Sequence, residues 1–577
     1  MAHSSKQFLW KIGAPAGYGV MTTGLSMSKI AARSGLHIFD YTEYPSLIQG
    51  GHNTYEVNIS TEHVTMTKDA VDCLVCLTPD TYALHEHRLH EDSIIVFDPS
   101  QGDPDMNGLK VAVPFQEILN QLKASKIMLN MISFSASVAI LGGKLEMIND
   151  MIKQQFAKKE PEVTEMNIAC ATAGFNYVIE HYADKVVPII SAAQPPAVSP
   201  AILDANTAFS LGAVEADCRF YAAYPMSPSS TVIEILASWQ SKTGMVVRHA
   251  EDEIGVVNEA LGASFAGVRS AVGTSGGGFA LMAETVSYAG VAEQPIVIFV
   301  AQRPGPATGM PTWTEQGDLL FAIHAGHGEF PKIVIAPGDA EEMLELTPKA
   351  FNLADIYQTP VIVLSDKLIS EAHKDIPQDK VATLLKTHTV YRGETMASTE
   401  APYYRYQDQE DGISPRLIPG HPGMYYQSNS YEHYSDSHTT EESADRIAQV
   451  NKRARKIDTY FRRNWSPPTV YGDIDAAEVI FVSWGGTKGA VQAAQILLGQ
   501  QDRHNAFIHF THVFPLKADD ITPLFKSGKR YILVENNSTG QFGQVLRAAT
   551  GIDLQERLLK YDGRPIFAEE IVAFVDR

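Results

Sequence analysis

Short apolar runs alternate with amphipathic stretches in the first third of the chain. Residues 8–12, 37–41 and 93–97 are apolar runs of strand length, and residues 20–32 have the apolar spacing of a helix. Strands that alternate with helices in this way are typical of an α/β domain with a largely parallel sheet. The pattern predicts such a domain at residues 1–190.

The same alternation returns twice further along the chain. A Pro/Ala/Ser-rich stretch at 191–202 indicates a linker. After it, α/β patterns cover 203–372 and 443–577, and the second of these ranges begins with a helix. We therefore expect three α/β domains with mostly parallel sheets. The expected strands of the last two domains are 271–274, 296–300, 333–335, 361–364, 479–483, 506–510 and 531–535, and the expected helices are 254–265 and 443–463.

Residues 373–442 differ from the rest. They are rich in Tyr, His, Asp, Ser and Pro and have little periodicity, which predicts an extended surface segment. Such long loops are uncommon unless they are functional. Five tyrosines indicate that the segment packs on something, and a partner subunit is one candidate: Tyr403, Tyr404, Tyr406, Tyr425 and Tyr426.

Composition excludes some partners. The 577 residues carry a net charge of −21, which argues against nonspecific binding to nucleic acid or to an anionic membrane. The sequence has no run of about 18 apolar residues, and its first residues lack the apolar core of a signal peptide. We expect a cytoplasmic protein whose partners are proteins or small molecules.

Four cysteines are too few for a disulfide framework. Cys73 and Cys76 form a C-x-x-C, but the surrounding run at 70–77 is apolar, so a buried strand is the favoured interpretation. Since no other cysteine pair lies nearby, this chain offers no plausible set of four thiolates for an iron–sulfur cluster.

Candidate chemistry starts at a rigid turn. Ser227 stands between Pro225 and Pro228, which restrict the backbone on both sides, so its hydroxyl is held ready to donate to a substrate. The structural alternative is that Ser227 or Ser229 caps a following helix.

A cluster of carboxylates precedes the expected helix at 254–265. Glu251, Asp252 and Glu253 stand at its start, where acidic residues also stabilise a helix through its dipole. A partly buried carboxylate at such a position can bind a cofactor ring, with its ionisation tuned by burial.

An arginine follows the expected strand at 296–300. Arg303 would lie at the carboxyl end of that strand, where open α/β sheets bind ligands, and its guanidinium can hold a carboxylate bidentately. The Pro/Gly-rich sequence after it predicts a rigid loop ending at Thr312.

Together these three motifs resemble the α subunit of 2-oxoacid:ferredoxin oxidoreductases, and the N-terminal block resembles the family's γ module fused ahead of it. The resemblance implies a γ-type domain, a thiamine diphosphate pyrimidine-binding domain and a transketolase C-terminal-like domain. It assigns Glu253 to the pyrimidine ring, with Glu251 as the fallback, and places Tyr224 and Pro225 beside the cofactor. Ser227, Arg303 and Thr312 become substrate-binding residues.

The resemblance also implies what other chains supply. The family's Gly-Asp-Gly motif, which holds the diphosphate through Mg²⁺, is missing here, and Asn536–Asn537 lacks its upstream partner. A β subunit should therefore bring the diphosphate site, Mg²⁺ and a [4Fe-4S] cluster, for which this chain offers no set of four thiolates. We expect a dimer of αβ units. Gly17 and Gly19, in a turn before a helix, are candidates for contact with coenzyme A.

The implied reaction is coenzyme A-dependent oxidative decarboxylation of a 2-oxoacid with reduction of ferredoxin, or the reverse carboxylation that fixes CO₂ in the reductive TCA cycle. The loop at 303–318 and the segment at 411–416 look most like enzymes of 2-oxoglutarate, whose product is succinyl-CoA. Pyruvate, a branched-chain 2-oxoacid, a noncatalytic docking subunit and a transketolase-like enzyme acting alone are the alternatives. Candidate donors to a second substrate carboxylate are His52, His249, Arg416 and His421.

Overall fold

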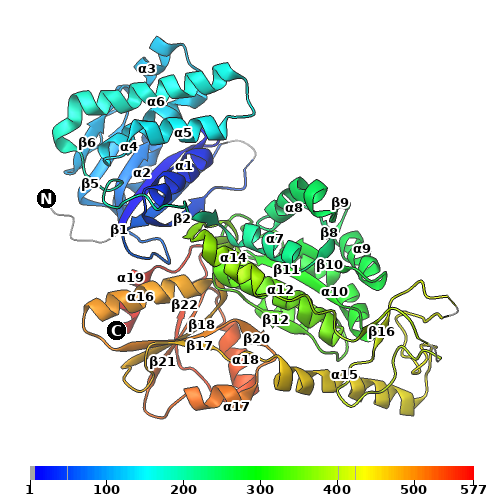
Figure 1. The fold of residues 1–577 in the computed structure, drawn as a ribbon. Coiled ribbons are helices and arrows are strands. Elements are labelled where there is room, and N and C mark those ends of the chain that lie inside the picture. The colour runs from blue at the N-terminus through cyan, green and yellow to red at the C-terminus, as the bar shows by residue number, and fades with distance from the viewer. Residues whose placement is uncertain (1–6, 48–49, 400–401, 423) are drawn as a thin grey trace. The chain divides into compact units, whose positions relative to one another are not determined.

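The chain folds into two compact units, which are described separately. A computed structural model describes residues 7–47, 50–399, 402–422 and 424–577. The first unit comprises the chain up to Leu203 with Ala372–Lys380 and Phe567–Glu569, and the second comprises Asp204–Glu371, Val381–Ile566 and Glu570–Arg577 (Figure 1). The finer domain boundaries expected from the sequence stay predictions.

An eight-stranded sheet forms the centre of the first unit. In spatial order its strands are β6 (Leu109–Ala112), β5 (Leu89–Phe97), β4 (Val71–Cys76), β1 (Gln7–Pro15), β3 (His52–Ser60), β2 (His37–Glu43), β14 (Lys374–Ile376) and β7 (Ala201–Leu203). The half from β6 to β1 is parallel, as expected, whereas β3, β2, β14 and β7 pair antiparallel. The difference arises because β3 lies between β1 and β2 and runs antiparallel to both.

Helices cover this sheet and supply most of its core. α4 is buried along its whole length and packs on α6, and Figure 1 shows α4, α5 and α6 together on one side of the sheet. The helices of the unit are α1 (Val20–Arg33), α2 (Pro79–His85), α3 (Phe115–Leu122), α4 (Leu129–Ile140), α5 (Leu145–Gln155) and α6 (Pro161–Tyr182). Cys73 and Cys76 lie in buried β4, so the structural interpretation of the C-x-x-C is confirmed.

A seven-stranded sheet organises the first part of the second unit. Its order is β20 (His512–Phe514), β12 (Ile333–Ile335), β13 (Pro360–Asp366), β11 (Ile296–Gln302), β10 (Arg269–Thr274), β8 (Cys218–Ala223) and β9 (Val246–His249). All neighbours are parallel except β20, which joins β12 antiparallel from the C-terminal part of the chain. Its main helices are α7 (Ala205–Glu215), α8 (Ser230–Thr243), α9 (Glu253–Phe265), α10 (Gly276–Val291), α11 (Leu319–His324) and α12 (Ala340–Tyr357).

The C-terminal part of the second unit is a smaller α/β layer. Its sheet has the order β17 (Thr469–Tyr471), β19 (Asn505–Phe510), β18 (Val479–Trp484), β21 (Arg530–Glu535) and β22 (Glu556–Leu559), parallel except at β17. The helices are α16 (Lys488–Gln500), α17 (Ala518–Ile521), α18 (Gln541–Thr550) and α19 (Ala568–Val575). One hydrophobic core joins residues of both sheets, including Val300 and Trp484, which is why contacts merge the two layers into one unit.

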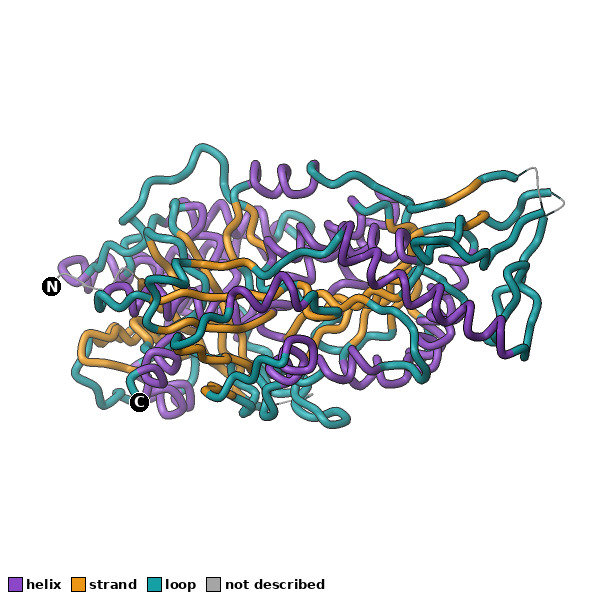
Figure 2. The backbone as a smooth tube through the Cα atoms, turned by 90° about the horizontal axis from the view of Figure 1, so that it is seen from below, coloured by secondary structure: helices purple, strands orange, loops and turns teal. Residues whose placement is uncertain are grey.

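The segment between α14 (Gln378–Lys386) and α15 (Ser443–Arg463) is mostly loop, with two short strands, β15 (Thr395–Met396) and β16 (Arg416–Leu417) (Figure 2). Part of it packs on its own unit. Tyr406 is fully buried, its ring stacks on His433 at 3.5 Å, and the Arg405 guanidinium donates to the Glu293 carbonyl. Tyr404 and Tyr425 are instead 46% and 75% exposed.

None of the helices in the described parts of the chain combines the length and the apolar character needed to cross a membrane.

Candidate active site

The candidate residues of the second unit gather at one edge of its seven-stranded sheet. β8, β9, β10 and β11 are parallel, so their carboxyl ends share an edge, where ligands bind in open α/β folds. Tyr224 follows β8, Arg303 follows β11, and the glycine-rich start of α10 follows β10. Glu253 begins α9, shortly after β9.

Glu253 is a buried carboxylate with an unused oxygen. The residue is 5% exposed, and its Oε1 has no hydrogen-bond partner within the described residues. A Cβ on Gly278 would lie 2.7 Å from that oxygen, so the glycine of α10 makes room for the carboxylate. An unpaired buried carboxylate oxygen is costly, which suits a group that binds a ligand.

The neighbouring acids differ from Glu253. Asp252 is the N-cap of α9, and its Oδ1 accepts from the Gly255 N–H at 2.7 Å. Glu251, the fallback candidate, is exposed. The structure thus separates one structural, one solvent-exposed and one buried acid that sequence spacing alone could not distinguish.

The turn at Ser227 leads into α8. Ser229 is the N-cap residue of α8, but no side chain caps this helix. The Ser229 Oγ instead donates to the Met226 carbonyl at 2.8 Å. The capping alternative for these serines is therefore wrong. Pro225 is exposed, and Tyr224 is exposed with its ring 6.1 Å from the His249 ring.

Arg303 joins this turn to the loop that follows β11. Its Nη1 donates to the Ser227 carbonyl at 2.7 Å, while its Nε is shielded and has no partner among the described residues. Burial lowers the pKa of Arg303, and the Asp318 carboxylate opposes that shift. The guanidinium is thus anchored through Nη1, and its Nε–H remains able to donate a hydrogen bond to a ligand.

The loop from Arg303 to Asp318 carries further groups. Thr312 is 4% exposed, and its Oγ1 has no partner in the described structure. Burial raises the pKa of Asp318 to about 6, with Arg303 acting in the opposite direction. Burial and then the Asp318 charge raise the pKa of Glu315 to about 7. The sequence motifs assign no role to Glu315 and Asp318, although both lie in the loop at 303–318; their acidity in the same loop as Arg303 is the signal that could have identified them.

Asn536 and Asn537 hold this loop. The Asn536 N–H donates to Gln316 Oε1 at 3.0 Å, and the Gln316 N–H donates to the Asn536 carbonyl at 2.7 Å. Asn537 Nδ2 donates to the Gln316 carbonyl at 3.1 Å, and Gln541 Nε2 donates to the Gly317 carbonyl at 2.7 Å. We call Gln316, Asn536, Asn537 and Gln541 the amide clamp.

A stacked pair supports the amide clamp. The Arg564 guanidinium lies 3.3 Å from the centroid of the Trp313 ring, and the Thr314 N–H donates to the Gly563 carbonyl at 3.1 Å. The C-terminal layer therefore fixes the loop that begins at Arg303.

Three of the candidate donors to a second substrate carboxylate do not join these residues. Arg416 is buried in a charge network: its Nη1 donates to the Ser264 carbonyl at 3.3 Å, and its Nη2 lies 3.6 Å from Asp355. Ser264 is at the far end of α9 from Glu253, roughly 16 Å away at about 1.5 Å per residue. His421 is engaged locally with the Pro422 carbonyl, and His52 belongs to the first unit.

In the first unit, Gly17 and Gly19 shape the turn between β1 and α1. Both have positive φ values, 93° and 74°, and Gly19 is the N-cap of α1. A Cβ on Gly19 would collide with the Asn130 side chain, whereas Gly17 faces open space. These glycines are explained by backbone geometry, and coenzyme A contact stays a prediction.

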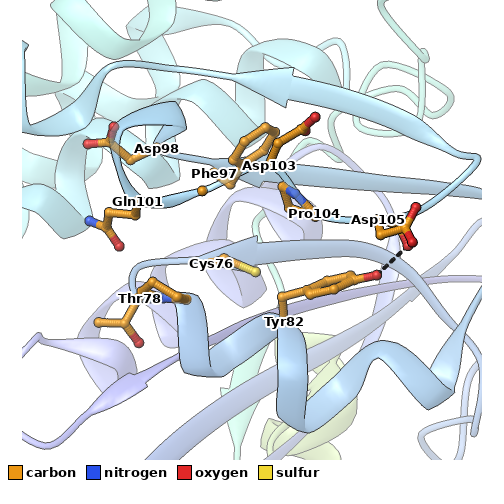
Figure 3. Close-up of a pocket in the computed structure, with 11 residues that line it drawn as sticks. Cys76, Thr78, Tyr82, Phe97, Asp98, Gln101, Asp103, Pro104 and Asp105 are labelled. Atoms are coloured by element: carbon orange, nitrogen blue, oxygen red, sulfur yellow. Dashed lines mark hydrogen bonds between the residues drawn. The ribbon is translucent and has the colours of Figure 1, made fainter.

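A cleft of about 300 Å³ opens beside the carboxyl ends of β4 and β5. Figure 3 shows Tyr82 and Phe97 in its lining, with Asp98, Asp103 and Asp105 nearby and the Tyr82 hydroxyl donating to the Asp105 carbonyl at 2.6 Å. The lining has acidic groups but no basic side chain, so the cleft does not fit a phosphate.

The residues present fit the pyrimidine side of thiamine diphosphate, because Glu253 offers a buried, unused oxygen beside a glycine cradle. Among the described residues, no group of three or more His, Cys, Asp or Glu side chains could hold a metal ion.

Comparisons with protein families match two regions. A family described as pyruvate flavodoxin/ferredoxin oxidoreductase, thiamine diP-binding, matches residues 211–452, and one described as pyruvate ferredoxin/flavodoxin oxidoreductase matches residues 9–177.

Similar proteins align with most of the chain or nearly all of it. The 2-oxoacid:ferredoxin oxidoreductase subunit alpha of Saccharolobus solfataricus is 30% identical over 97% of this chain and 96% of its own length. The 2-oxoglutarate oxidoreductase subunit KorA of Mycobacterium tuberculosis is 30% identical over 77% of this chain and 67% of its own. The structure of a 2-oxoglutarate:ferredoxin oxidoreductase from Magnetococcus marinus, with 2-oxoglutarate, coenzyme A and succinyl-CoA bound, matches with a TM-score of 0.92 at 28% identity, over 99% of both chains.

Proposed function

This chain belongs to the 2-oxoacid:ferredoxin oxidoreductase alpha subunits, an oxidoreductase family, and on that premise we propose that it acts on 2-oxoglutarate, forming succinyl-CoA with reduction of ferredoxin or running the reverse carboxylation. The observation that carries the proposal is the pairing of buried Glu253 with Arg303 at one edge of a parallel sheet. One group fits a cofactor ring and the other fits a carboxylate.

Glu253 is proposed to bind the cofactor. Thiamine diphosphate supplies the carbon nucleophile that attacks a 2-oxoacid carbonyl. The unpartnered Oε1 of Glu253 would accept a hydrogen bond from the pyrimidine ring and so favour its reactive tautomer. The neighbours of the ring in this proposal are Tyr224 and Pro225.

Arg303 is proposed to bind the substrate carboxylate next to the reactive carbonyl. Its Nη1 is fixed by the Ser227 carbonyl, and its free Nε provides a charge-assisted donor. The Ser227 hydroxyl and the buried Thr312 hydroxyl would orient the carbonyl. Positioning of this kind is the main contribution that the chain makes to the rate.

The choice of 2-oxoglutarate rests on relatives. Several are named for this substrate, including 2-oxoglutarate synthase subunit KorA of Methanothermobacter marburgensis, 30% identical over 64% of this chain. The bound 2-oxoglutarate and succinyl-CoA in the Magnetococcus marinus structure support the same choice. Pyruvate and branched-chain 2-oxoacids are the competing substrates.

The proposal includes partner chains. We infer that a β subunit brings Mg²⁺, the diphosphate site and a [4Fe-4S] cluster, that ferredoxin accepts the electrons, and that the enzyme is a dimer of αβ units. The relatives' names as subunit alpha support a multisubunit enzyme. The four cysteines are free thiols, which is compatible with the expected cytoplasmic location.

Reconstitution tests the proposal. The chain is purified with its β subunit, supplied with thiamine diphosphate, Mg²⁺ and coenzyme A, and assayed anaerobically for viologen reduction and for the acyl-CoA product. We expect 2-oxoglutarate to give succinyl-CoA with a higher kcat/KM than pyruvate or branched-chain 2-oxoacids. A preference for another 2-oxoacid would overturn the substrate, and inactivity with all of them would favour a noncatalytic docking subunit.

A further inference from the structure

Asp318 and Arg303 each keep an unused buried atom beside the other's charge. Asp318 Oδ2 and Arg303 Nε are shielded from solvent, and neither has a hydrogen-bond partner in the described parts of the chain. Their charges act on each other, since each opposes the effect of burial on the pKa of the other. The two opposite charges therefore interact electrostatically without a direct hydrogen bond.

The backbone keeps the Asp318 carboxylate in place. A Cβ on Gly276, the first residue of α10, would collide with both carboxylate oxygens, so the absence of a side chain there creates the seat. The positive end of the α10 dipole also favours an anion at this position. The Asp318 N–H donates to Gln302 Oε1 at 3.0 Å, which fixes the backbone next to β11.

Helix capping does not explain this carboxylate. Asp318 is the N-cap residue of α11, yet its side chain makes no cap hydrogen bond. Asp204, Asp252 and Asp339 cap their helices with the side chain, so the chain uses aspartate for capping where capping is the role. Because the Asp318 carboxylate does not cap its helix, its interaction with the Arg303 guanidinium is the better explanation of its position.

We propose that Asp318 is a positioning residue for substrate binding: its carboxylate compensates the charge of Arg303 in the empty site and takes up a proton from solvent when a substrate carboxylate takes over that role. This inference rests on the proposed function, in which Arg303 binds the carboxylate of a 2-oxoacid. It adds to that function a carboxylate that loses its negative charge when the anionic substrate binds.

The proton uptake follows from the surrounding charges. Asp318 faces Arg303 from the end of β11, Glu315 from its own loop and the N-terminal amides of α10, while Glu253 of α9 lies beside Gly278, further along that helix. A substrate carboxylate on Arg303 brings a second negative charge to this cluster and removes the compensation that Arg303 gave to Asp318. Both changes disfavour ionised Asp318 and raise its pKa above the value of about 6 in the empty site.

The sign of the pH effect is fixed by this coupling. Well below pH 6, Asp318 is protonated in both the free and the bound enzyme, so the affinity for the 2-oxoacid is highest there. As the pH rises, the free enzyme ionises first, so binding requires protonation of the carboxylate and KM increases. A rise of one pKa unit on binding gives an increase in KM of about sevenfold between pH 5.5 and 8.

The test uses the assembled enzyme with and without thiamine diphosphate. Binding of 2-oxoglutarate to the thiamine-free enzyme is measured by calorimetry at pH 6.5 in two buffers of different ionisation enthalpy, which gives the protons taken up. The KM for the 2-oxoacid is then measured from pH 5.5 to 8. Asp318→Asn is compared with Asp502→Asn, an exposed aspartate at positive φ, where asparagine is also tolerated.

We expect proton uptake and a pH-dependent KM in the unmodified enzyme and in Asp502→Asn, and the loss of both in Asp318→Asn with kcat retained. Binding without proton uptake, or uptake that persists in Asp318→Asn, would overturn the role of Asp318 and leave the proposed function intact. If no 2-oxoacid binds, the proposed function fails and the inference fails with it. If Asp318→Asn does not fold, absence of proton uptake in the unmodified enzyme is still sufficient to reject the inference.

Discussion

The Arg303 guanidinium donates to the Ser227 carbonyl at 2.7 Å, across 76 residues of sequence. The contact joins the loop after β11 to the turn after β8, two strands that flank β10 in the same parallel sheet. It makes the two motifs parts of one site.

Replacement of Arg303 by lysine should impair 2-oxoacid binding. Lysine keeps the charge but lacks the planar fork that reaches Ser227 and a carboxylate together. Loss of a charge-assisted hydrogen bond worth about 1.5–3 kcal/mol predicts an increase in KM of about 10- to 150-fold, measured by steady-state kinetics. Arg547→Lys, at an exposed arginine, is the control; an unchanged KM in Arg303→Lys would contradict the assignment.

Replacement of Glu253 by glutamine should impair activation of the thiamine cofactor. The amide cannot promote the reactive tautomer, so kcat should fall about 10²- to 10⁴-fold, the size expected for a positioned acid–base group. The test compares Glu253→Gln with Glu284→Gln, an exposed glutamate of α10, in activity and in thiamine diphosphate affinity. If Glu251→Gln is inactive and Glu253→Gln is active, the fallback assignment is correct instead.

Gly278→Ala, in helix α10, should disturb the Glu253 carboxylate. The added Cβ would clash with Thr274 Oγ1 and would lie 2.7 Å from Glu253 Oε1, closer than van der Waals contact allows. Activity should therefore fall together with thiamine diphosphate affinity. Gly262→Ala on α9 is a matched control, because its Cβ meets nothing within 4 Å and alanine favours the helix by about 1 kcal/mol; equal losses in both variants would argue against a specific contact.

The apolar pattern predicted central strands such as β4, β11 and β13 because their residues are buried on both faces. It also predicted α15 at 443–463, as observed. It could not place β3 between β1 and β2, since strand order depends on long-range pairing. The candidate active-site residues came from motifs; Asp318 and the amide clamp did not, because their partners are fixed only by tertiary structure.

The amide clamp shows why such tertiary contacts could not be predicted from the sequence. Asn536–Asn537 was noticed as half of a missing diphosphate motif, but its partner Gln316 lies about 220 residues away in the sequence. Gln316→Ala should remove buried hydrogen bonds and lower the free energy of unfolding by about 1–3 kcal/mol. Thermal unfolding measures that change, and kcat/KM for the 2-oxoacid should fall as the loop loosens. Retained kcat/KM in a destabilised variant would show that the clamp does not position Arg303.

A second buried carboxylate, Glu56, is expected to contribute to stability against acid. Burial opposes ionisation of Glu56, but Arg88 at 3.0 Å and Lys11 at 3.1 Å outweigh it and hold its pKa at about 2. Because the folded pKa is below the unfolded value of about 4.5, this stabilisation is present above pH 4.5 and is lost as the pH falls toward 2. The difference corresponds to a stability on the order of 3 kcal/mol.

Denaturant unfolding at a series of pH values checks this expectation. Stability should decline steeply between pH 4.5 and 2, and the part contributed by Glu56 should be absent in Glu56→Gln. Identical pH profiles for the two proteins would show that another group governs acid unfolding.

The central claim is that this chain carries one side of a split thiamine diphosphate site. Calorimetric titration of thiamine diphosphate with Mg²⁺ into the chain alone, the β subunit alone and the assembled pair tests it most directly. Tight binding by the assembled pair that is weakened by Glu253→Gln is the predicted result. Equally tight binding to the isolated chain, or binding to the pair that Glu253→Gln leaves unchanged, would contradict the claim.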